Sequence, residues 1–153
     1  IVRDGAKSVC IALRQSQAYL RLYAEVGRHG PLHAGGGSLL LLAYAPDDIR
    51  DTVLGGELTG YTERTITEPS LLREELARVR RQGYHVALED LDEGAFSIAT
   101  PIRDHRGDVV AAISVAGPIT RLDDATRDRH LRLANTAAED ISRRLGRVDR
   151  ELA

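Results

Sequence analysis

The chain has 153 residues, of which 42% are hydrophobic and 29% are charged, and this composition is ordinary for one globular domain with a sizeable core. Its formal net charge of −2 excludes a general electrostatic attraction to nucleic acid or to anionic membranes. The single cysteine, Cys10, excludes an intrachain disulfide and a zinc site built from several cysteines.

The first apolar runs, residues 7–13 and 18–26, flank the polar stretch 14–17 and predict a β-hairpin. Cys10 falls in the first run. No basic residue adjoins it, which favours a small buried side chain over a reactive thiol. Residues 27–37 are rich in glycine and are expected to form a loop.

A short helix is predicted at residues 39–44, since leucine and alanine favour helices and no β-branched residue is present. The longest apolar run of the chain lies here and is far too short to span a bilayer. A second helix is expected over residues 47–54, where Pro46 fits the helix start and the pair Gly55-Gly56 ends it.

Residues 62–67 are predicted to be extended, and Pro69 then opens a longer helix that Gly83 ends. The apolar face of this helix consists of Leu72, Leu76 and Val79. These positions are spaced by three or four residues, as on one side of an amphipathic helix, so the helix is expected to pack on the core through them.

Three strands are predicted next, at residues 84–88, 96–103 and 109–115. An acidic loop, residues 89–94, connects the first pair of strands. A turn at residues 104–108, with a glycine where a positive φ is needed, connects the second pair.

A long helix is expected from residue 123 to residue 147, with Thr120 and Asp123 resembling a capping box at its start. Its buried stripe is predicted to consist of Ala134, Ala137, Ala138, Ile141 and Leu145. Hairpins dominate this order of elements. The whole chain is therefore predicted to be one α+β domain, with an antiparallel sheet of about five or six strands and helices packed against it.

The glycines at positions 35–37 do not form a phosphate-binding P-loop, because Ser38 is followed by Leu39 and no lysine is near. Two readings stay open. Backbone N–H groups at a glycine-rich helix entrance can bind a small anion such as a carboxylate, or the glycines only permit a tight bend.

No catalytic or metal site is predicted. A hydrolase would need His33, Ser97 and Asp90 in one cleft, and a lone histidine at a loop–helix junction is more often a structural hydrogen-bond donor. The histidines lack metal-ligand spacing, and the acidic stretch 89–93 lacks the pattern of a calcium loop, which favours a solvated loop.

Ser97 and Ser114 lie within apolar strands, and neither is in the context of a nucleophile elbow. A buried hydroxyl needs a hydrogen-bond partner or a polar cavity, because its burial without either costs about 1–3 kcal/mol. Two inward-facing serines in an apolar sheet therefore predict a small polar pocket.

Four segments, in order, resemble the C-terminal effector-binding domain of IclR-type bacterial transcriptional regulators. They are GRHGPLHAGGGSLLLLAYAP, RTITEPSLLREELARVRRQGYHV, EGAFSIATPIRD and VVAAISVAGPITRL, and together the resemblance covers nearly the whole chain. The resemblance implies a GAF-like or profilin-like curved antiparallel sheet with helices around it. It also implies a single effector-binding domain over residues 1–153, with no catalytic activity and no cofactor.

The same resemblance implies the partners. A small organic effector, a carboxylate or an aromatic acid, binds between the sheet and the loops, and its binding alters operator affinity. A winged helix-turn-helix domain that contacts DNA is expected upstream, since the chain begins at Ile1 and contains no methionine. The protein is expected to be a cytoplasmic homodimer or tetramer that does not contact membranes.

The family's ligand-contacting positions fall on Gly36 and Gly37 in the glycine loop, on Ser97, on Ser114 and on Ala116. The resemblance further places apolar pocket walls at Leu20, Leu22 and Ile98, and Ala87 is also expected to contact the ligand. A bulky residue at either glycine is expected to abolish ligand binding while the domain still folds.

The chain departs from the family pattern at three places. Ser38-Leu39 replaces a common Gly-Lys, Ala87 and Leu88 stand where two aspartates are common, and Ala116 lacks a hydroxyl. A more apolar effector, or a lost effector response, would follow from these changes. A GAF-like sensor with another output and a ligand-free dimerisation module remain alternatives.

Overall fold

The computed structural model describes residues 1–17 and 24–148, which form two three-stranded antiparallel sheets and four α-helices. The first sheet has the order β1-β2-β3, with strands β1 (Val2–Asp4), β2 (Lys7–Val9) and β3 (His29–Pro31). The second sheet has the order β4-β5-β6, with strands β4 (His85–Leu88), β5 (Ala95–Arg103) and β6 (Val109–Pro118).

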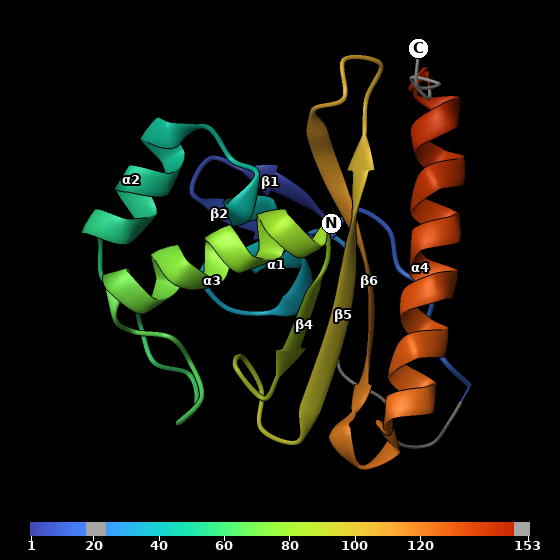
Figure 1. The fold of residues 1–153 in the computed structure, drawn as a ribbon. Helices are drawn as coiled ribbons and strands as arrows, with labels where there is room; N and C mark the ends of the chain where they lie inside the picture. Colours follow the sequence, from blue (N-terminus) through green and yellow to red (C-terminus); the bar gives the residue numbers. More distant parts are fainter. Residues whose placement is uncertain (18–23, 149–153) are drawn as a thin grey trace.

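The helices are α1 (Gly36–Ala43), α2 (Asp47–Gly55), α3 (Pro69–Gln82) and α4 (Asp124–Arg144). A short 3-10 turn, Ile119–Arg121, leads into the last of them. The second sheet lies between two layers: α1 and α3 are on one side of it and α4 runs along the other (Figure 1). The predicted α+β class is confirmed.

The two sheets meet at one residue pair. The backbone nitrogen of Ile1 donates to the oxygen of Ala112 at 2.8 Å, and the nitrogen of Ala112 donates back to the oxygen of Ile1 at 2.9 Å. This exchange places β1 beside β6. The six strands therefore form two joined sheets rather than the single sheet that the sequence predicted.

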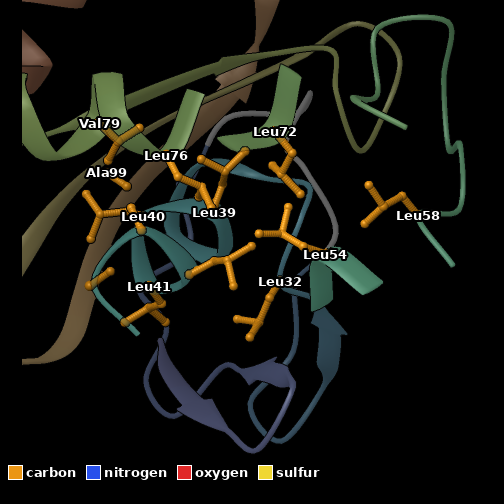
Figure 2. Close-up of a cluster of buried hydrophobic side chains, with 13 residues drawn as sticks. Leu32, Leu39, Leu40, Leu41, Leu54, Leu58, Leu72, Leu76, Val79 and Ala99 are labelled. Carbon is orange, nitrogen blue, oxygen red and sulfur yellow. The ribbon is translucent and has the colours of Figure 1, made fainter. Parts of the chain in front are cut away.

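The core between the second sheet and the helices is built on α1, which is buried on all sides. Its four leucines, residues 39–42, are each at most 3% exposed. They pack against Leu72, Leu76 and Val79 of α3 and against Ala99 of β5 (Figure 2). Complete burial explains why this helix carries no charged residue.

Helix α3 is formed as predicted. Pro69 occupies its first turn, where a missing N–H costs nothing, and Gly83 ends it in the left-handed conformation with φ 81°. The predicted helices at residues 39–44 and 47–54 and the last three strands are also confirmed, with ends that differ by a few residues. The turn at residues 104–108 has its glycine, Gly107, at φ 88°.

The predicted hairpin of residues 7–13 with 18–26 is wrong. Strand β2 ends at Val9 and pairs with β1 and β3, while residues 24–26 are not in a strand and residues 18–23 lie outside the described part. Strand β3 falls inside the expected glycine loop. Glycine and proline are depleted in strands, so the local sequence carries no signal for this strand.

Two further local predictions are wrong. Cys10 is half-buried and lies outside the strands. Residues 62–67 are not extended: the hydroxyl oxygen of Thr65 accepts hydrogen bonds from the amides of Tyr61 and Thr62, both at 2.9 Å, and this folds the segment into a turn. Threonine hydroxyls compete with strand pairing in this way.

The buried stripe of α4 differs from the prediction near its end. Ile141 and Leu145 are 36% and 46% exposed, whereas Ser142 is fully buried. The Ser142 hydroxyl donates to the oxygen of Ala138 at 2.7 Å and accepts from the amide of Arg103 at 2.9 Å. A polar residue thus fixes the helix against β5, which an apolar pattern does not reveal.

Asp123 is the N-cap of α4, and its carboxylate accepts from the amide of Thr126 at 2.7 Å. Thr120 lies in the preceding 3-10 turn, so the predicted capping box with Thr120 at the helix start is wrong. We expect Asp123→Ala to lower the midpoint of urea unfolding, because one amide of the first turn loses its partner. Urea unfolding measures the change. Asp123→Asn, which keeps an oxygen acceptor, should retain most of the stability, and an equal loss in both variants would contradict the capping role.

Candidate effector site at the start of helix α1

A cavity of about 220 Å³ lies where the start of α1 meets β5, β6 and the loop after β4. Its described lining consists of Ile1, Ala24, Gly35, Gly36, Gly37, Ser38, Ala87, Asp90, Leu91, Asp92, Ala95, Phe96, Ser97, Ser114 and Ala116. Six of the nine residues that the sequence placed in the ligand site are among them. The cavity is large enough for a small organic molecule.

The start of α1 presents backbone donors at this cavity. Gly35 precedes the helix with φ 85°, which favours glycine, and its amide donates to the Asp90 carboxylate at 2.8 Å. Within the described chain, the next three amides, of Gly36, Gly37 and Ser38, have no hydrogen-bond acceptor. Free first-turn amides and the helix dipole together favour an anionic group at this position.

Two serines provide hydroxyls on the sheet side of the cavity. Ser97 on β5 pairs with Ala116 on β6, and Ala99 pairs with Ser114, so the two serines are diagonal neighbours on one face of the sheet. Their Oγ atoms are 2.7 Å apart and hydrogen-bonded. Each hydroxyl retains capacity for another hydrogen bond, which a ligand could use.

Gly36 has a second role, as a packing contact. A Cβ atom at this position would lie 2.4 Å from the Ser97 Oγ and 2.8 Å from the Ser97 backbone oxygen. Helix α1 therefore approaches β5 at a distance that only glycine allows. A bulky residue at Gly36 is therefore expected to disturb the fold as well as ligand binding, because the helix would have to move off the sheet.

Gly37 is different, since a Cβ atom there would meet chiefly the end of the Ile1 side chain, at 2.6 Å.

Ala87 and Ala116 line the cavity, as the sequence predicted. Ile98 is not part of the described lining: it is fully buried, on the face of β5 opposite Ser97 and Ala99.

Two of the expected wall residues, Leu20 and Leu22, lie outside the described residues. Sequence reasoning did not place Asp90 in a ligand pocket. Its bond to Gly35 spans 55 positions of the chain, and no local pattern signals such a contact. Neighbouring Asp92 was likewise assigned only to a solvated loop.

The charges of the cavity constrain its ligand. Its described lining contains two aspartates and no arginine, lysine or histidine. An acidic group of the ligand would therefore be stabilised by the start of α1 and not by an ion pair with a basic side chain. The carboxylates of Asp90 and Asp92 favour a ligand that also carries hydroxyl or N–H donors.

The three residues of the hydrolase alternative each have a separate partner. His33 hydrogen-bonds through Nε2 to the oxygen of Thr59 at 2.9 Å, Ser97 bonds to Ser114, and Asp90 accepts from Gly35. No bond joins His33, Ser97 or Asp90 to another of the three in the described structure. Likewise, residues 1–17 and 24–148 contain no group of three or more side chains that could hold a metal ion.

Behind the cavity, a buried histidine joins α3 to α1. His85 is 3% exposed; its Nδ1 lies 3.0 Å from the oxygen of Gly36 and its Nε2 lies 3.2 Å from Oε1 of Glu75. Arg78 donates to the same Glu75 carboxylate, through Nε at 2.8 Å. The hydrogen bond from His85 is the largest cause that lowers the pKa of Glu75, to about 2.

This shift predicts a stability change in acid. Glu75 contributes stability above its ordinary pKa of 4.5, and this is lost as the pH falls towards about 2, where the folded protein also protonates it. We expect Glu75→Gln to cost about 1–2 kcal/mol near neutral pH and to flatten the decline between about pH 5 and pH 3. Urea unfolding at several pH values measures both effects.

The matched control is Glu74→Gln, an exposed neighbour on α3. Its acid decline should match that of the wild type. An unchanged decline in Glu75→Gln would contradict the assignment.

None of the helices in residues 1–17 and 24–148 combines the length and apolar character needed to span a bilayer.

Comparison with known proteins gives consistent results. A family described as "Bacterial transcriptional regulator IclR C-terminal" matches residues 1–143. The chain is 36% identical to the HTH-type transcriptional repressor AllR of Salmonella typhi over 149 residues, which is 95% of this chain and 54% of that protein. It is 35% identical to the HTH-type transcriptional regulator KdgR of Escherichia coli over 147 residues, which is 95% of this chain and 56% of KdgR.

Solved structures agree. A transcriptional regulator of Rhodococcus, RHA06195, superposes with a TM-score of 0.89 at 31% identity, covering 95% of this chain and 59% of that one. The C-terminal domain of E. coli KdgR superposes with a TM-score of 0.83 at 32% identity, covering 95% of this chain and 84% of that one. The chain spans about half the length of the curated relatives it matches.

Proposed function

This chain belongs to the IclR family, by its match to the C-terminal domain of these bacterial transcriptional regulators, and we propose that it is the part that binds a small-molecule effector and forms oligomers. The resemblance inferred from four sequence segments is thereby confirmed. The relatives with which it aligns are regulators and not enzymes.

The observation that carries the proposal is the cavity at the start of α1. The unbonded backbone amides of Gly36 and Gly37 and the hydroxyl pair of Ser97 and Ser114 belong to residues that line one cavity of about 220 Å³. Such a site suits a small carboxylic acid whose acidic group lies at the helix start. Aromatic acids of one ring remain in the proposed class, because Ala87 and Ala116 leave apolar space.

The proposed effector also carries a hydrogen-bond donor. Asp90 and Asp92 lie in the cavity wall, and an acid without hydroxyl or N–H groups would leave them without partners from the ligand. The departures from the family pattern predicted a more apolar effector, because polar groups are missing from the pocket. The carboxylates that remain favour an effector that also carries hydrogen-bond donors.

The role of the whole regulator follows as part of the proposal. A winged helix-turn-helix domain upstream would contact DNA, and this domain would act in the cytoplasm as a homodimer or tetramer. Effector binding changes operator affinity only if the effector has different affinities for the two conformations of the regulator.

The same cavity separates this proposal from its alternatives. A ligand-free dimerisation module needs no cavity with unpaired amides and paired hydroxyls. A GAF-like sensor with another output, such as a kinase, is not favoured by relatives that carry regulator names.

Calorimetric titration with a panel of small carboxylates, hydroxy acids and aromatic acids tests the proposal. At least one acid should bind, and it should raise stability by about 2–3 kcal/mol at about a hundred times its Kd. We expect Ala116→Phe to weaken its binding at least about tenfold, because the ring fills the cavity, which corresponds to about 1.4 kcal/mol.

The matched control is Val110→Phe, on the same strand but away from the cavity, at a residue that is 40% exposed. It should bind the acid like the wild type. Equal affinity in Ala116→Phe, with its fold intact by circular dichroism, would contradict the proposed location. The absence of any binding acid would contradict the effector role.

A further inference from the structure

His85 is a buried ionisable group that the proposed ligand site does not use directly. It lies on β4, behind the first turn of α1, and is 3% exposed. Its two ring nitrogens contact two different elements: Nδ1 faces the carbonyl oxygen of Gly36 and Nε2 faces the carboxylate of Glu75. The second contact joins β4 to α3.

Both partners of the ring are acceptors. A carbonyl oxygen has no hydrogen to give, and an ionised carboxylate has none either. The contact with the Gly36 oxygen is a hydrogen bond when Nδ1 carries the hydrogen. The charged groups around it are Glu75 and, beyond it, Arg78 on α3; α1 contributes the carbonyl, and the β5 residue paired with His85 is Ala99.

The contact with Gly36 has a geometric consequence for Gly37. The two residues share one peptide bond, which is planar and trans, so the carbonyl of Gly36 and the N–H of Gly37 point in opposite directions. A bond that holds the carbonyl towards His85 therefore holds the N–H of Gly37 away from it, towards the start of the helix. The residues at that start of the helix, Gly35 to Ser38, line the cavity.

A restraint of this kind matters at a Gly-Gly peptide. Glycine has the largest choice of backbone conformations, and the first turn of a short helix has few hydrogen bonds to hold it. Helix α1 has eight residues and no side-chain cap at its start. The carbonyl of Gly36 has two lone pairs, so it can accept from His85 in addition to its helical partner.

We propose that His85, clamped by Glu75, is a positioning residue of the effector site, which holds the Gly36–Gly37 peptide with its N–H directed into the cavity. This role rests on the proposed function, because it requires that the effector binds at the Gly36–Gly37 peptide. An acidic group bound at the Gly37 N–H polarises the same peptide and strengthens the bond from His85 to the Gly36 oxygen. Effector binding is thereby coupled to α3 through Glu75.

Two variants of His85 separate positioning from simple packing. His85→Asn keeps a side-chain N–H donor near the position of Nδ1 and loses the contact with Glu75. His85→Leu fills similar space but offers no donor. The residual dipolar coupling of the Gly37 amide, measured in the ligand-free, weakly aligned, ¹⁵N-labelled domain, reports the direction of its N–H bond.

In His85→Leu we expect the Gly37 coupling to fall towards zero through averaging, while couplings in α4 keep their values. In His85→Asn the Gly37 coupling should stay close to that of the wild type.

An unchanged Gly37 coupling in a folded His85→Leu variant would overturn the proposal. If that variant does not fold, Glu75→Gln serves in its place: a smaller Gly37 coupling with a broadened Gly37 amide supports the proposal, and an unchanged coupling overturns it. These measurements need no ligand, so they test the orientation of the peptide separately from effector binding. If no acid binds in the calorimetric panel, the proposed function fails, while the dipolar couplings still decide whether His85 orients the Gly36–Gly37 peptide.

Discussion

Replacing Leu40 with alanine is expected to lower the free energy of unfolding by about 2–5 kcal/mol. The Leu40 side chain is fully buried in the cluster that also contains Val79 of α3 and Ala99 of β5 (Figure 2). Its truncation removes buried apolar contacts and leaves a cavity that the packed elements around it close only in part. Urea unfolding followed by circular dichroism measures the loss.

Leu71→Ala on α3 is the matched control, since the same atoms are removed from a side chain that is 52% exposed. Its effect should stay below about 1 kcal/mol. Equal losses in the two variants would contradict the central place of α1 in the core.

Replacing Gly36 with alanine is expected to lower the free energy of unfolding by about 1–3 kcal/mol, although alanine favours helices more than glycine does. The added Cβ would lie within 3 Å of three atoms of Ser97, one of which is its backbone oxygen. The strand cannot yield as a flexible side chain could, so α1 must shift. The serine pair of the cavity would be disturbed at the same time.

Gly55→Ala provides the comparison. Gly55 is the last residue of α2, and a Cβ atom there would meet nothing within 4 Å. Alanine should be neutral at this position or stabilise the fold by up to about 1 kcal/mol, because it restricts the unfolded chain. A Gly36→Ala variant as stable as the wild type would mean that α1 and β5 are not held so closely.

Elements with strong local signals could be predicted from the sequence. Pro69 and Gly83 mark the two ends of α3, and its three buried residues recur at helical spacing. In contrast, His29–Pro31 becomes a strand only because β2 is available to pair with it. Short strands of weak propensity depend on their tertiary partners, which one sequence does not display.

Some residues of the candidate site could likewise be predicted from the sequence, and others could not. Ser97 and Ser114 could be predicted together, since each is a polar residue in an apolar strand and the two strands form a hairpin. The contacts of Asp90 with Gly35 and of His85 with Gly36 could not. They connect residues 55 and 49 positions apart, and their meaning depends on how α1 lies against the sheet.

The exposed end of α4 shows a limit of apolar patterns. The predicted stripe continued through Ile141, but the helix faces β5 with Ser142, one residue further on. Hydrogen bonding to a strand amide outweighed apolar spacing there. A serine that bonds both its own helix and the neighbouring strand gives no distinctive signal in the sequence.

The most direct test of effector binding at the start of α1 is an amide ¹H–¹⁵N titration of the labelled domain with the acid panel. We predict that at least one acid moves the amide resonances of Gly36, Gly37 and Ser38 more than any others, because these amides receive its carboxylate. Effector binding at the start of α1 is contradicted if no acid moves them, or if the largest shifts come from α4.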